Sequence, residues 1–162
     1  MPEGTPLEIE RVQHIAAINA RNEFFIGRQD VLDSLISLVY SKATIREKFP
    51  SGLALAVVWG KAGCGKSALM ARFCKTLQSP KRDGDSAARD DDFILYHIVG
   101  ATPASQSLRG LLRRLCQELM VAAKTESALP ESIEGLCESF GRLLSTFSRR
   151  VIIVIDAVNQ VC

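Results

Sequence analysis

The chain has 162 residues, of which 47% are hydrophobic and 23% are charged. This is the length and composition of about one globular domain. The net charge of +2 gives no electrostatic reason to expect nucleic acid or an anionic membrane as a partner. The five cysteines are odd in number and form no C-x-x-C pair, so we expect reduced thiols in a cytoplasmic protein rather than disulfides or a zinc site.

Two helices are predicted in the first 48 residues. Apolar residues recur at loosely helical spacing over residues 7–20, and they fall on one helical face over residues 29–40. Between these segments lies Phe25-Ile26-Gly27-Arg28, where Gly27 can supply the positive φ of a turn into the second helix. Pro50-Ser51-Gly52 then closes the region.

Residues 60–67 fit the P-loop pattern G-x-x-x-x-G-K-[ST] at every fixed position. They follow an apolar run at 53–59, which predicts a parallel strand buried on both faces, and they precede a helix that we expect to reach about residue 77. The loop amides and the helix N-terminus should then bind phosphate, with Lys66 reaching the β- and γ-phosphates and Ser67 on Mg²⁺. The predicted nucleotide-binding residues are Gly60, Lys61, Ala62, Gly63, Cys64, Gly65, Lys66 and Ser67.

The second half of the chain predicts two further strand-and-helix units. Residues 79–92 read as a polar, turn-rich connection, and residues 93–99 as a second buried strand. A Ser- or Thr-capped helix should run to about residue 123, and another helix should occupy residues 133–147. On the first of these helices we expect Leu108, Leu111, Leu112, Leu115, Leu119 and Met120 on the apolar face and Arg109, Arg113 and Arg114 on the solvated face.

The strand predicted at residues 151–155 ends in Asp156, which is the Walker B pattern. A buried parallel strand projects its C-terminal residue into the crevice where open α/β sheets bind ligands. Asp156 is therefore predicted to hold Mg²⁺, through water or through Ser67.

With these motifs in place, the chain resembles the signal-transduction ATPases with numerous domains (the STAND class). Residues 96–105 and 153–160 are similar to nephrocystin-3-like and telomerase-associated NACHT-type proteins, and Phe25–Arg28 resembles the motif that lies near the adenine in that class. The resemblance implies an α/β fold, namely a P-loop NTPase core of three α/β/α layers with a parallel sheet and N-terminal helices. It also implies ATP or ADP with Mg²⁺ as cofactors, and Arg28 near the nucleotide.

Two departures from the family pattern qualify this expectation. NACHT proteins commonly carry an acidic residue a few positions after the Walker B aspartate, where this chain has Asn159 and Gln160. A neutral amide is a poor base, so we expect slow ATP hydrolysis or nucleotide binding used mainly as a switch, with Lys66 and Asp156 as the catalytic residues. Family members also continue with further strands and repeats, so we expect this chain to be the N-terminal part of a larger protein.

The sequence thus predicts an N-terminal helical segment at 1–48 and the first part of a NACHT-like domain at 49–162. Protein partners are expected through repeats beyond the chain, together with a nucleotide-dependent oligomer of the full-length protein. Two alternatives share the P-loop: a non-catalytic interaction module with a structural nucleotide, and a nucleotide or nucleoside kinase. A kinase should carry clustered arginines in a lid, whereas Arg113-Arg114 and Arg149-Arg150 do not lie in lid-like loops. No guanine-reading N-K-x-D motif is present, which favours ATP over GTP.

Overall fold

The computed structural model describes residues 4–23, 25–40, 54–79 and 92–161. The chain divides into two compact units, one formed by residues 1–17 and 91–162 and the other by residues 18–90. The division falls within helix α1 (Pro6–Glu23), which the sequence predicts at 7–20. The predicted turn at 50–52, the domain boundary at 48/49 and nearly all of the predicted connection at 79–92 lie outside the described residues.

The unit of residues 18–90 contains helices α2 (Gln29–Tyr40) and α4 (Lys66–Gln78), which pack against each other. Both helices lie where the sequence predicts them. The apolar face of α2 buries Leu32, and α4 buries Leu69, Phe73 and Leu77. The same unit contains the P-loop, which leads directly into α4.

The prediction of a buried strand at 53–59 is wrong in this structure. Residues 54–60 form no regular secondary structure, and Leu55, Val57 and Trp59 are 74%, 70% and 88% exposed. A run of apolar residues becomes a strand only when another strand pairs with its backbone. Both strands in the described part of the chain belong to the other unit and pair with each other.

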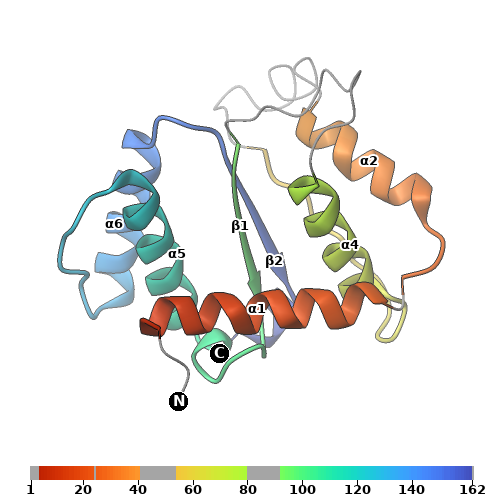
Figure 1. The fold of residues 1–162 in the computed structure, drawn as a ribbon, viewed down its shortest axis with the longest axis horizontal. Helices are drawn as coiled ribbons and strands as arrows, with labels where there is room; N and C mark the ends of the chain where they lie inside the picture. The colour runs from red at the N-terminus through yellow and green to blue at the C-terminus, as the bar shows by residue number, and fades with distance from the viewer. Residues whose placement is uncertain (1–3, 24, 41–53, 80–91, 162) are drawn as a thin grey trace. The chain divides into compact units, whose positions relative to one another are not determined.

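The unit of residues 1–17 and 91–162 is built on two parallel strands, β1 (Phe93–Ile98) and β2 (Val151–Asp156), which pair from Phe93 opposite Val151 to Ile98 opposite Asp156. Parallel strands need a long crossover connection, and here it contains a short 3₁₀ turn and two helices. Figure 1 shows both helices on one side of the strand pair. These elements are η1 (Ala104–Gln106), α5 (Leu108–Ala123) and α6 (Ile133–Thr146), and a second 3₁₀ turn, η2 (Val158–Gln160), follows β2.

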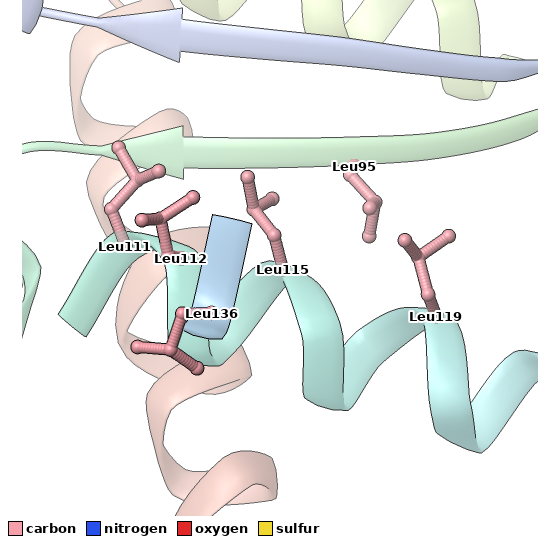
Figure 2. Close-up of a cluster of buried hydrophobic side chains, with 6 residues drawn as sticks. All are labelled: Leu95, Leu111, Leu112, Leu115, Leu119 and Leu136. Atoms are coloured by element: carbon pink, nitrogen blue, oxygen red, sulfur yellow. The ribbon is translucent and has the colours of Figure 1, made fainter. Parts of the chain in front are cut away.

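The core of this unit lies between α5, α6 and the strands (Figure 2). Both helices begin at a serine cap: the Ser107 and Ser132 hydroxyls accept hydrogen bonds from the amides of Gly110 and Gly135. The helical period of α5 then turns one row of leucines toward β1, and α6 adds one more. The buried leucines are Leu95, Leu111, Leu112, Leu115, Leu119 and Leu136.

The α/β fold with a parallel sheet is confirmed, but two residues of α5 lie on the other side from that predicted. Leu108, at the first position of the helix, is 40% exposed. Arg114, predicted on the solvated face, is only 2% exposed. It flanks the leucine row, where the Tyr96 carbonyl and Glu118 provide hydrogen-bond partners. Those partners are what allows a guanidinium to be buried at this position.

Candidate nucleotide-binding site

The P-loop folds around the ammonium group of its own lysine. Lys66, the first residue of α4, donates from Nζ to the carbonyl oxygens of Gly60 and Lys61, each at 2.8 Å. Its Nζ also lies 3.9 Å from the Cys64 Sγ. The loop therefore brings Gly60, Lys61, Cys64 and Lys66 together.

Two glycines give this loop its shape. Gly63 and Gly65 have φ values of 74° and 84°, a region that costs a residue with a Cβ about 1–2 kcal/mol. Gly60 is needed for a different reason, because a Cβ at this position would lie 3.0 Å from the Cys64 Sγ. The two glycines that the motif fixes, Gly60 and Gly65, and the additional Gly63 thus lie at backbone positions where a side chain would strain or crowd the loop.

The electrostatics of the loop suit an anion. Gly65 precedes α4 and has no side chain with which to cap the helix, and the first turn of α4 contains no acidic residue. No acidic residue of that turn offsets the partial positive charge of the helix N-terminus, and Lys66 adds a full positive charge. A phosphate group fits these donors in charge and in hydrogen-bonding character.

Arg28 lies in the same unit as the P-loop but is not bonded to it among the described residues. Gly27 and Arg28 both have positive φ, 80° and 56°, at the turn into α2. The turn that the sequence predicts at Gly27 is therefore present. The Arg28 side chain is exposed, and its carbonyl accepts the amide of Leu32 in the first turn of α2.

Asp156 ends strand β2, as predicted, and is 4% exposed. Its carbonyl accepts the Val99 amide at 3.2 Å, which extends the strand pairing by one residue beyond Ile98. Ala157 follows with φ at 61°, a left-handed conformation that turns the chain sharply out of the strand into η2. Asp156 belongs to the unit of residues 91–162 and the P-loop to the unit of residues 18–90, and the structure describes each by itself.

A polar cluster at the carboxyl end of β1, buried except for the partly exposed Arg11, is a feature that the sequence did not predict. We define it as Arg11, His14, His97, Arg114 and Glu118, contributed by α1, β1 and α5. The rings of His14 and His97 lie 4.9 Å apart between centroids, and both side chains are fully buried. A hint lies in helical spacing, since Arg114 and Glu118 are four residues apart and form an ion pair of 3.3 Å.

Burial sets the protonation state of the two histidines in this cluster. It lowers the pKa of His97 to about 4, and the positive charge of the nearby Arg114 guanidinium acts in the same direction. Burial also lowers the pKa of His14, although its neighbour Glu10 acts in the opposite direction. Both rings are therefore neutral at pH 7. The described residues contain no group of three or more His, Cys, Asp or Glu side chains that could hold a metal ion.

A P-loop followed by a helix, together with an α/β unit whose strand ends in aspartate, defines the class of P-loop NTPase modules. The family model described as "NACHT domain" matches residues 54–162, and the chain belongs to this family. No helix in the described part of the chain is long and apolar enough to cross a membrane.

The chain is also similar to curated proteins, one of which is named for a NACHT domain. The chain is 29% identical over 107 residues to human NACHT and WD repeat domain-containing protein 2. This match covers 64% of this chain and 6% of the relative. It is 30% identical over 113 residues to mouse telomerase protein component 1. This match covers 65% of this chain and 4% of the relative. The chain therefore spans only a small part of the length of these relatives. No solved structure gives a significant match.

Proposed function

We propose that this chain is the nucleotide-binding module of a STAND-class signal-transduction NTPase, and that it binds Mg-ATP or Mg-ADP through residues 60–67. The observation that carries the proposal is the position of Lys66, whose Nζ is held by two loop carbonyls at 2.8 Å. The ammonium group therefore already faces the inside of the loop. Phosphate oxygens would replace these carbonyls as stronger, charge-assisted acceptors.

The remaining nucleotide contacts are proposed from the motifs. Ser67 and Asp156 would hold Mg²⁺, which neutralises charge on the phosphates when bound, and Arg28 would lie near the nucleotide. The position of Asp156 at the carboxyl end of β2 supports this role, because open α/β sheets bind their ligands at that end of the strands. Lys66 would neutralise phosphate charge during any hydrolysis.

Slow turnover is the second part of the proposal. Asn159 and Gln160 lie in η2, directly after the turn at Ala157, and both are exposed. An amide can orient a water molecule at this position but does not take its proton at neutral pH. Binding would then persist where hydrolysis is slow, and the nucleotide would act mainly as a switch or as a structural ligand.

We also propose how the module fits its parent protein. Residues 49–162 would be the first part of the nucleotide-binding domain, and residues 1–48 the helical segment that precedes it. The human relative is named for WD repeats, which supports protein partners bound by repeats beyond this chain. A cytoplasmic location and a nucleotide-dependent oligomer complete the proposal.

Magnesium dependence tests the proposed site. Titrating a fluorescent ATP analogue with and without Mg²⁺ should show a gain in affinity from Mg²⁺ in the wild type. Ser67→Ala and Asp156→Asn should abolish that gain, because each removes a proposed ligand of the cation. Asp30→Asn, which removes an exposed carboxylate on α2, is the matched control and should keep the gain. An equal gain in all four proteins would refute the proposed Mg²⁺ site.

A further inference from the structure

Strand β1 has a second edge, opposite the one that pairs with β2. The amides of Phe93 and Val99 donate to the carbonyls of Arg150 and Asp156, at 2.8 and 3.2 Å. Since the backbone groups of alternate residues point to opposite edges of a strand, the groups of Tyr96 and Ile98 point away from β2. We call this side the outer edge of β1, and no other strand pairs with it in the described part of the chain.

Side chains, rather than a strand, satisfy the outer edge. The Ile98 amide donates to the Nδ1 of His14 at 3.0 Å, and the Tyr96 carbonyl accepts the Nη1 of Arg114 at 2.6 Å. His14 comes from α1 and Arg114 from α5. Both are buried, so these two contacts satisfy the Ile98 amide and the Tyr96 carbonyl in place of a neighbouring strand.

Helix α1 is fastened over this edge by an ion-pair chain. The guanidinium of Arg11 donates hydrogen bonds to the Glu118 carboxylate. Its Nε lies 3.0 and 2.9 Å from the two oxygens, and its Nη2 lies 2.6 Å from Oε2. Glu118 also accepts Arg114 at 3.3 Å and is only 5% exposed. One buried carboxylate thus joins the α1 arginine to the α5 arginine that caps Tyr96. Bidentate charge-assisted pairs of this kind are the stronger ones.

The sequence of β1 explains why a cover is needed. The strand reads Phe-Ile-Leu-Tyr-His-Ile, six residues without a charged side chain at neutral pH and rich in β-branched and aromatic types. A segment of this composition with an open edge is a template for pairing with another chain. In a solution of this protein, the strand available to pair with this edge is β1 of a second copy of the chain.

We propose that α1 is a built-in cover of the outer edge of β1, held by Arg11 and His14, which keeps that edge from pairing with a second copy of the chain. Helix α1 precedes the residues that match the NACHT family model, which begin at residue 54. The extension before the matched region therefore completes the edge of the sheet inside it. This role is independent of nucleotide binding and stands whether or not the P-loop binds ATP.

The test uses the 162-residue chain with Arg11→Ala and His14→Ala combined, and Gln13→Ala on the exposed side of α1 as the matched control. In sedimentation velocity, the double variant should form dimers whose fraction rises with concentration, while the wild type and control stay monomeric. Adding Ile94→Pro should restore the monomer, because residue 94 points its amide to the outer edge, where proline is tolerated but blocks pairing. A double variant that stays monomeric, or dimers that survive Ile94→Pro, would overturn the proposal.

Amide hydrogen exchange in the single variant Arg11→Ala gives an independent reading that requires no dimer. Loosening α1 should speed exchange of the Ile98 amide, bonded to His14, by about tenfold, the worth of one lost hydrogen bond. The Val99 amide, bonded to Asp156 on β2, should change by less than about twofold. Equal acceleration at both amides, or none at Ile98, would show that α1 does not open separately from the sheet and would overturn the proposal.

Discussion

Acid should destabilise the unit that contains β1, because His97 is buried in its neutral form. Its Nε2 lies 2.9 Å from the Ser105 carbonyl, which can only accept, so this nitrogen carries the proton and donates. The Nδ1 has no hydrogen-bond partner among the residues that the structure describes. A second proton would therefore be buried without an acceptor, between His14 and Glu10 of α1 and Arg114 of α5.

The size of the effect follows from proton linkage. The pKa of His97 is lowered from 6.5 to about 4 in the folded chain, so between these values the unfolded chain binds more protons than the folded one. The free energy of unfolding that depends on a neutral His97 ring is fully present above pH 6.5 and is lost as the pH drops toward 4. At about 1.4 kcal/mol per pKa unit, His97 alone should remove about 2 kcal/mol between pH 7 and 5, and about 3 kcal/mol by pH 4.

The assay benefits from a chain with only two histidines, His14 and His97. A ring-proton NMR titration should place both histidine midpoints below 6.5, with the His97 midpoint near 4. Urea unfolding followed by circular dichroism should lose about 2 kcal/mol more in the wild type than in His97→Gln between pH 7 and 5, because the amide keeps a donor for Ser105 but does not titrate. Trp59 belongs to the other unit, so its fluorescence does not report on β1. A His97 midpoint near 6.5, or equal pH slopes in both proteins, would refute the reasoning.

Three further predictions concern other parts of the chain. In thermal melts, Gly110→Ala should destabilise the fold by more than about 1 kcal/mol, because a Cβ at this position would lie 2.0 Å from the Ala104 carbonyl oxygen. The control Gly141→Ala has open space around the added Cβ and should stabilise α6 by up to about 1 kcal/mol. Cys64, beside the Lys66 ammonium, should react with a thiol label and be protected by Mg-ATP; labelling at an unchanged rate would contradict this. Phosphate release under single-turnover conditions should stay well below about 1 s⁻¹, and a faster rate that Asp156→Ala abolishes would show a competent ATPase.

Local signals in the sequence predicted most of the elements. The helices at 29–40 and 133–147 carry a clear apolar period, and their observed bounds differ from the predicted ones by no more than a residue. The P-loop pattern fixed the start of α4, since the glycines and the lysine act within one short loop. Asp156 was placed at the end of its strand by the β-branched run before it.

Features that depend on distant parts of the chain were not predictable in this way. Residues 54–60 have the composition of a buried strand, but strand formation depends on a neighbour that composition does not reveal. Arg114 belongs by type to a solvated face, yet Arg11 and Glu118, which share its ion-pair chain, are 107 residues apart in sequence. Burial of His14 and His97 likewise arises only once α1 meets β1.

The central claim is that Lys66 holds the phosphates of a bound nucleotide, and equilibrium binding of Mg-ATP tests it most directly. Isothermal titration of the wild type should be compared with Lys66→Ala and with Lys75→Ala, which removes a lysine from the last turn of the same helix. Losing charge-assisted bonds to phosphate should weaken binding by about tenfold to a hundredfold in Lys66→Ala. Lys75→Ala should bind as the wild type does. Equal affinities in all three proteins, or no binding by the wild type, would contradict the account.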